Sequence, residues 1–250
     1  MKPVAIQLYT LREMAKQDFV GVLKLVAEIG YAGVETAGLH GMRAKEVRKV
    51  LDDLGLACCS VHGPFPSKDN VNQTVDDARE LGTDLVISGL GPKDFAPEAL
   101  AASLARLEEA AGLIGDAGAQ FGYHNHWWEF DKIDGRLAYE RMLEELPDMF
   151  SELDIYWASN FGAVDVPKLV ERNKERIQLL HVKDGPLVKG QPHTAVGKGK
   201  MPTRACIEAA DPDFLDWLVV ELDECGTDMA QAVRDSYKFL AGEGLAQGRE

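Results

Sequence analysis

Short apolar runs alternate along the chain with longer segments in which apolar residues recur at helical spacing. Each run is rich in Val, Ile, Leu or aromatic residues, as buried strands are. The eight runs begin at Val4, Gly33, Ala57, Asp84, Phe121, Ser151, Ile177 and Trp217. Their starts lie about 30 residues apart on average, which is the size of one βαβ unit. Intervening segments such as residues 19–27 and 47–54 place apolar side chains on one helical face. The pattern predicts eight repeated βα units.

Glycines and the connections support one repeated architecture. Gly30, Gly55, Gly82 and Gly118 each follow a helical segment, where a residue that tolerates positive φ is favoured. Strands that alternate with helices form parallel sheets, and eight such units close into a barrel. We therefore expect the α/β class and a (β/α)₈ TIM barrel, with residues 1–250 as a single domain. A doubly wound open sheet is the alternative, but it fits neither the eight units nor the lack of GxGxxG after the first strand.

The charge and cysteine content of the chain indicate which binding partners and which cellular compartment to expect. The 250 residues include 27 Lys+Arg and 41 Asp+Glu, and the net charge of −14 disfavours nucleic acid, whose phosphates are bound chiefly by lysine and arginine. The four cysteines form neither a metal-ligand spacing nor a disulfide framework. No apolar run approaches the length of a membrane span, and the N-terminus has no signal-peptide pattern. We expect a cytoplasmic protein with no membrane or nucleic-acid partner.

Polar side chains end almost every predicted strand. They include Tyr9, Glu35, His62, His124 with His126, Asp154, His181 with Lys183, and Glu221. Active sites of such barrels lie at the C-terminal ends of the strands, where residues two apart share a face. Neighbouring strands lie about 4.8 Å apart, so inward groups on successive strands can converge on one ion. Two histidines and two carboxylates favour Mn²⁺, Zn²⁺, Co²⁺ or Fe²⁺ over Mg²⁺ or Ca²⁺.

Each of these residues also has a plainer interpretation. A strand histidine can simply be hydrogen-bonded within the core, and Asp154 and Glu221 could form buried salt bridges with Lys183 or Arg204. The occurrence of four ligand types at the ends of four successive strands is what favours a metal site over these separate explanations.

Several motifs resemble one family in order and across essentially the whole chain. They are AGVET, SVHGPF, FGYHNHWWEF, SELDIYW, LLHVKDG, VGKGKMP and VVELDE. They resemble the xylose isomerase-like TIM barrel superfamily, which includes the sugar phosphate isomerases/epimerases and inosose dehydratases. The resemblance implies one divalent metal ion bound by His124, Asp154, His181 and Glu221. Many epimerases of this superfamily carry Glu where this chain has His124, so one of two carboxylates that exchange protons is missing. Glu129 could supply it, as a base or as a ligand.

We expect a metal-dependent isomerase or epimerase that acts on a small ketose, polyol or keto-sugar through an enediolate. Glu221 or Glu129 would be the base, and Lys183, His126 or Glu35 the facing acid. The expected substrate contacts are His62, His126, Trp128 and Tyr9, with Trp127 and Trp128 as a candidate lid.

Three other functions remain open: a metal-dependent dehydratase or lyase of inosose or 3-keto-sugar type, a non-catalytic sugar-binding barrel, and an apurinic-site endonuclease. The glycine-rich residues 196–202 could be a flexible loop or a phosphate-binding nest. Whether the substrate is phosphorylated and whether the chain forms a homo-oligomer also remain open. Trp157 and Phe161 would suit a dimer rim.

Overall fold

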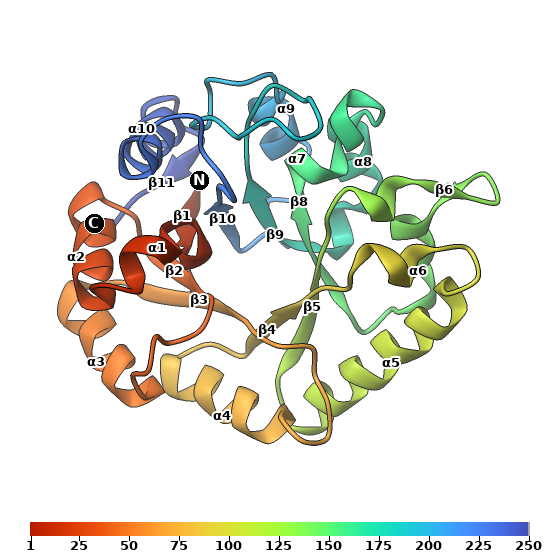
Figure 1. Cartoon of the computed structure of the whole chain (residues 1–250), viewed down its shortest axis with the longest axis horizontal. Coiled ribbons are helices and arrows are strands. Elements are labelled where there is room, and N and C mark those ends of the chain that lie inside the picture. The colour runs from red at the N-terminus through yellow and green to blue at the C-terminus, as the bar shows by residue number, and fades with distance from the viewer. Residues whose placement is uncertain (250) are drawn as a thin grey trace.

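Eight parallel strands close into a barrel in the computed structural model, which describes residues 1–249 (Figure 1). The strands are β1 (Lys2–Gln7), β2 (Gly33–Thr36), β3 (Ala57–His62), β4 (Leu85–Ser88), β5 (Gln120–His124), β8 (Phe150–Asp154), β9 (Ile177–Val182) and β10 (Trp217–Val220). Each pairs in parallel with the one before it, and β10 pairs back with β1, where Val219 lies opposite Ala5. The eight predicted strands are all present, and the single-domain (β/α)₈ barrel is confirmed.

Helices form the outer ring of the barrel (Figure 1). They are α1 (Arg12–Ala15), α2 (Phe19–Ile29), α3 (Ala44–Leu54), α4 (Val71–Leu81), α5 (Leu100–Asp116), α6 (Ala138–Glu145), α7 (Ile155–Ala158), α8 (Val166–Asn173), α9 (Thr203–Glu208) and α10 (Met229–Gly242). Gly30, Gly55 and Gly82 follow α2, α3 and α4 with φ of 114°, 65° and 91°, the left-handed conformation expected at a helix end. Within residues 1–249 no helix has the length and hydropathy needed to span a bilayer.

Short elements complete the chain. The 3₁₀ turns are η1 (Leu8–Leu11), η2 (Pro92–Phe95), η3 (Trp128–Phe130), η4 (Asn160–Gly162) and η5 (Lys174–Arg176). The strands β6 (Lys132–Ile133) and β7 (Arg136–Leu137) form a small hairpin, and β11 (Ala246–Gln247) pairs with β1.

The barrel interior changes from apolar to polar along the strands. Leu85, Phe150 and Leu179 form an apolar cluster against Trp217 near the strand starts. Because alternate residues of a strand share a face, Phe150 is followed inward by Glu152 and then by Asp154. The polar layers therefore lie toward the C-terminal ends of the strands, at the barrel mouth.

Candidate metal centre and active site

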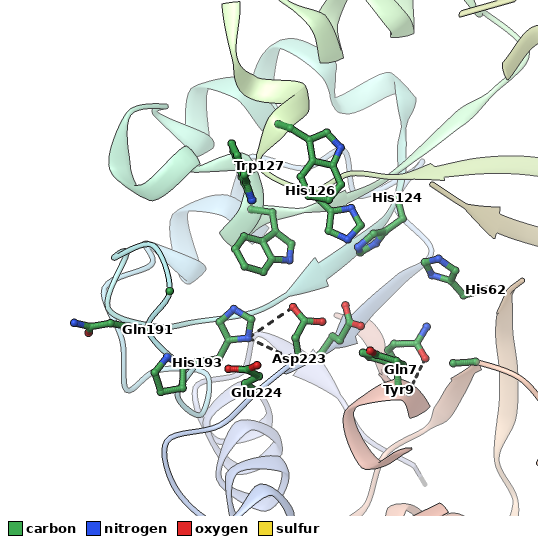
Figure 2. A pocket seen from close by; sticks show the side chains of 16 residues that line it. Gln7, Tyr9, His62, His124, His126, Trp127, Gln191, His193, Asp223 and Glu224 are labelled. Atoms are coloured by element: carbon green, nitrogen blue, oxygen red, sulfur yellow. Dashed lines mark hydrogen bonds and ion pairs between the residues drawn. The ribbon is translucent and has the colours of Figure 1, made fainter. Parts of the chain in front are cut away.

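A cavity of about 690 Å³ opens at the barrel mouth (Figure 2). His124, His126 and Trp127 approach it from one side, and His193 and Asp223 from another. The complete lining is Gln7, Tyr9, Ala37, His62, His124, His126, Trp127, Trp128, Trp157, Gly190, Gln191, Pro192, His193, Glu221, Asp223 and Glu224. All four side chains predicted to contact substrate are in this set, so the structure places them where such contacts can form.

The four predicted metal ligands converge at the base of this cavity. One ligand atom from each of four side chains lies within 4.8 Å of the others, and all four side chains are buried: His124, Asp154, His181 and Glu221. Among the described residues, the buried Asp154 Oδ2 forms no hydrogen bond by geometry and has an ion pair with Lys183 Nζ at 2.9 Å. Two nitrogen and two oxygen donors suit the transition-metal ions named above. The residues therefore fit a divalent cation.

Lys183 lies against the same carboxylates. Its Nζ is 2.9 Å from Asp154 Oδ2, 2.8 Å from Glu221 Oε2 and 2.9 Å from Asp223 Oδ2. Burial alone would lower the pKa of Lys183, but these three carboxylates raise it well above its ordinary value. The salt bridges that were the plainer interpretation of Asp154 and Glu221 are therefore present. Arg204 is not involved, since it pairs with Glu208 and Glu243.

The rings of His124 and His181 lie against carboxyl groups, two of which, those of Glu35 and Glu152, lie deeper in the barrel than the proposed ligands. His181 Nδ1 lies 2.9 Å from Glu221 Oε2, whereas its Nε2 lies 3.1 Å from Glu152 Oε2 and 3.2 Å from Glu35 Oε1. His124 Nδ1 lies 3.0 Å from Glu152 Oε2. Glu152 is fully buried and was missed in the sequence, although it is two residues before Asp154 and hence on the same strand face. The spacing of two residues from Asp154 is the feature of the sequence that could have identified Glu152.

The geometry does not support a catalytic role for Glu35. Its side chain is fully buried and does not line the cavity. Gln7 Nε2 donates to its Oε1, and Ser60 Oγ donates to its Oε2 at 2.5 Å. Burial opposes ionisation, but His181, Glu152 and His62 together lower the pKa of Glu35 well below its ordinary value. Glu35 is thus an ionised acceptor beneath the site rather than an acid facing the substrate.

Glu129 is also placed away from the cavity. Tyr123 Oη donates to its Oε1 at 2.7 Å, and the backbone N–H of His126 donates to its Oε2 at 3.0 Å. Burial raises the pKa of Glu129 to about 8. Both oxygens are engaged in fixing the turn after β5, so the predicted base or ligand role of Glu129 has no support in the geometry.

Aromatic side chains form one wall of the cavity. The His126 ring stacks on Trp128 with centroids 4.3 Å apart and planes at 9°. Trp157 lines the cavity, and Phe161 packs against Trp127 and Trp157 with centroids 6.0 and 6.1 Å apart. Trp157 and Phe161 therefore belong to the aromatic wall of the site.

His193 is a further cavity residue that the sequence did not indicate. Its Nδ1 accepts the backbone N–H of Asp223 at 3.2 Å, and its ring packs edge-on against Tyr156 and Trp157 with centroids 4.7 and 5.2 Å away. Burial and the nearby Lys183 lower the pKa of His193 to about 4. At neutral pH the imidazole is uncharged, and the hydrogen bond to Nδ1 assigns its proton to Nε2. His193 lies in a loop, where no strand alternation marks an inward residue.

The glycine-rich run after β9 binds a side chain of the protein itself. Four backbone N–H groups donate to the Asp184 carboxylate: those of Gly185 at 2.8 Å and of Gly197, Gly199 and Met201 at 3.0 Å each. A Cβ at Gly199 would collide with this carboxylate, so the close approach requires glycine. The run therefore forms an anion-binding nest, which was one of its two predicted roles. The Asp184 carboxylate occupies this nest and leaves no place for a phosphate.

The fold and this site define an α/β barrel with a buried nitrogen and oxygen donor cluster at its mouth. The family model described as xylose isomerase-like TIM barrel matches residues 23–242, so the chain belongs to this family. No protein of curated function matches the sequence significantly.

Solved structures show the same fold. A sugar phosphate isomerase/epimerase from Parabacteroides distasonis ATCC 8503 superposes with a TM-score of 0.83 at 23% identity, over 98% of this chain and 96% of that chain. The probable 3-DHS dehydratase AsbF from Bacillus anthracis gives 0.76 at 13% identity, over 96% and 99%. An L-ribulose 3-epimerase gives 0.66 at 17% identity, over 98% and 95%. At these identities the likeness establishes the fold alone.

Proposed function

We propose that this protein is a divalent-metal-dependent sugar isomerase or epimerase acting on a small, uncharged ketose, polyol or keto-sugar. The observation that carries the proposal is the cluster of His124, Asp154, His181 and Glu221 beneath an aromatic cavity. A divalent cation bound there would polarise a substrate carbonyl and its neighbouring hydroxyl, which makes the adjacent carbon easier to deprotonate.

We assign separate catalytic roles to three residues around the cluster. Glu221 Oε2 is engaged by His181 and Lys183, which leaves Oε1 available to accept a proton from the substrate. Lys183 is positively charged at neutral pH and can stabilise negative charge that develops on a substrate oxygen. His126 is fixed by stacking on Trp128, and burial and Lys183 lower its pKa to about 4, so on the aromatic side it is an uncharged imidazole that can accept a proton or form a hydrogen bond with the substrate.

The charges at the cavity support an uncharged substrate. Its lining includes Glu221, Asp223 and Glu224 but no lysine or arginine among the described residues. Nearby cations are already engaged: Lys183 by three carboxylates, and Lys189 by the face of Trp127, 3.7 Å from the ring centroid. A phosphorylated sugar would therefore meet negative charge without a compensating cation.

A dehydratase or lyase is the second candidate, and His193 favours it. The assigned Nε2–H of this uncharged imidazole can donate to a departing hydroxyl oxygen at the cavity wall. Isomerisation and dehydration share the first proton abstraction and differ in where the second proton goes.

The test is proton exchange in D₂O with neutral ketoses, polyols, inososes and 3-keto-sugars, each beside its phosphorylated counterpart where one exists. We expect deuterium at the carbon next to the carbonyl with a neutral compound in the presence of Mn²⁺, and much less after chelation. A new isomer indicates isomerisation, and loss of water indicates dehydration. Exchange with none of them would contradict the proposal.

Metal analysis tests the ligand set separately. The double variant Asp154→Ala, His181→Ala should lose bound metal, because it removes one oxygen and one nitrogen donor. Full metal occupancy in that variant would overturn the assignment of the site.

A further inference from the structure

A single carboxylate oxygen lies between the two histidines of the proposed metal centre. Glu152 Oε2 is 3.0 Å from His124 Nδ1 and 3.1 Å from His181 Nε2. The other nitrogen of His181 faces Glu221 at 2.9 Å. Each ring thus directs one nitrogen to Glu152, and that of His181 also lies 3.2 Å from Glu35 Oε1. The opposite nitrogen of each ring is the one that can face a cation in the cluster.

Strand register produces this arrangement. Glu152 of β8 lies directly opposite His124 of β5, and Asp154, two residues further, lies opposite His181 of β9. Glu152 therefore occupies the layer below Asp154 and points into the barrel under both rings. It is fully buried and does not line the cavity, so it contacts ligand residues rather than substrate.

We propose that Glu152 is a positioning residue that accepts an N–H from both His124 and His181 and so fixes their tautomers and ring orientations for metal binding. The inference rests on the proposed function, since it assumes that the cluster binds a divalent ion. Metal-binding histidines commonly donate their other ring N–H to a carboxylate, which orients the ring and increases the basicity of the ligand nitrogen. Here one carboxylate oxygen does so for two histidines.

This role also accounts for the unusual residue on the fifth barrel strand. With His124 in place of a glutamate, the four proposed ligands carry only the two carboxylates of Asp154 and Glu221. Glu152 adds a third carboxylate in contact with both ligand histidines. The carboxyl group missing from the ligand set is thus present one layer deeper.

A direct ligand role is the competing interpretation of Glu152. Two other groups also bring ligand atoms within 4.8 Å: His62 with His124 and Glu152, and Glu35 with Glu152 and His181. In both, however, Glu152 Oε2 already faces a ring nitrogen at hydrogen-bonding distance. The two roles differ in outcome, because removal of a ligand abolishes the site whereas removal of a positioning group weakens it.

The experiment titrates the metal-stripped full chain with Mn²⁺ by calorimetry and with Co²⁺ by visible absorption. For Glu152→Gln we expect a Mn²⁺ affinity about 10- to 100-fold weaker, with unchanged stoichiometry and an altered Co²⁺ spectrum. Glu129→Gln is the matched control, because it also replaces a buried carboxyl group, but one that contacts only Tyr123 and the His126 backbone. It should bind Mn²⁺ as the wild type does.

A readout of the tautomers separates positioning from a general structural effect. Long-range ¹H–¹⁵N spectra of the metal-free protein should show a proton on His124 Nδ1 and a proton on His181 Nε2. Glu152→Gln should change these assignments, whereas Glu129→Gln should not. Should Glu152→Gln fail to fold, Glu152→Asp retains the carboxyl group but withdraws its oxygens from the rings, and we expect a several-fold weaker affinity.

Three results would overturn the inference: wild-type affinity in the folded Glu152 variant, complete loss of binding at unchanged fold, or an equal loss in Glu129→Gln. If the wild-type chain itself binds neither ion, the proposed function fails and this inference with it. If the wild type binds and the Glu152 variant matches it, only the role of Glu152 is lost.

Discussion

The side chain of Asn125 forms two hydrogen bonds with the backbone of Asp154. The Asp154 N–H donates to Asn125 Oδ1 at 2.9 Å, and Asn125 Nδ2 donates to the Asp154 carbonyl at 3.2 Å. The Asp154 carboxylate in turn accepts the N–H of Trp157 at 2.9 Å, at the start of α7. The amide of Asn125 thus joins the ends of β5 and β8, each of which carries a proposed metal ligand.

Replacement of Asn125 by alanine should therefore destabilise the fold. It leaves a buried N–H and a buried carbonyl unpaired, and we expect the free energy of unfolding to fall by about 2 kcal/mol. Urea denaturation measures the change. Asn173→Ala is the control: its Nδ2 donates to the Leu169 carbonyl from a half-buried position on α8, and water can replace that bond. A loss no greater than that of the control would contradict the assignment.

Lys183 should oppose metal binding while it supports turnover. Its ammonium lies within 2.9 Å of oxygens of Asp154 and Glu221, so Lys183→Met removes a positive charge from the proposed ligand cluster. We expect several-fold tighter Mn²⁺ binding and a larger Mn²⁺-induced rise in Tm. Substrate proton exchange should fall by at least about 100-fold.

Lys189→Met is the comparison for this change. Lys189 lies over the Trp127 ring rather than against the ligands, so its loss should leave Mn²⁺ affinity unchanged. Weaker Mn²⁺ binding in Lys183→Met would show that the ammonium supports the site instead of competing for it.

The fold and the ligand cluster follow from two periodicities of the sequence. A repeat near 30 residues predicts the eight strands, and the alternation of strand side chains predicts which groups point inward. Because parallel strands end at the same edge, the four proposed ligands from four successive barrel strands come together without knowledge of the helices. This is why His124, Asp154, His181 and Glu221 form one cluster in the structure.

Depth and loop conformation could not be predicted in the same way. The alternation of side chains along a strand predicts which face of the sheet a residue lies on, but not how deep in the barrel it lies. Glu35, opposite Gln7 of β1, therefore points inward but lies below the cavity. Glu129 follows β5, where the chain turns and alternation no longer applies. His193 and the ligands of Asp184 depend on how residues 185–201 fold back on themselves, which no local pattern specifies.

Glu129 should make the protein less stable as the pH rises. Its pKa is raised by burial from 4.5 to about 8. Between these values the unfolded chain releases the proton and the folded chain retains it, so ionisation favours the unfolded state. The free energy of unfolding should therefore fall between about pH 4.5 and pH 8 by a contribution that Glu129→Gln lacks.

Urea denaturation of both proteins at several pH values measures this contribution as a difference. The stability of Glu129→Gln relative to the wild type should increase steadily across the interval. Glu108→Gln, on the exposed face of α5, should follow the wild type. Parallel curves for the wild type and Glu129→Gln would show that Glu129 is already ionised in the folded protein.

The Asp184 carboxylate should determine whether the loop over the cavity is ordered. Asp184→Asn places an NH₂ group where an oxygen accepts two backbone N–H groups, so at least two of the four bonds are lost and donors face one another. Hydrogen bonds to a charged group contribute about 1.5–3 kcal/mol each, which is enough to open a surface loop. Residues 190–193 of this loop line the cavity, so substrate exchange should decrease while Mn²⁺ affinity is retained.

Limited trypsinolysis measures the order of this loop, and in Asp184→Asn it should become faster at Lys189, Lys198 and Lys200. Asp165→Asn, which alters the N-cap of α8 and its ion pair with Lys168, should leave those rates unchanged. Wild-type cleavage in Asp184→Asn would mean that the loop is ordered by other contacts.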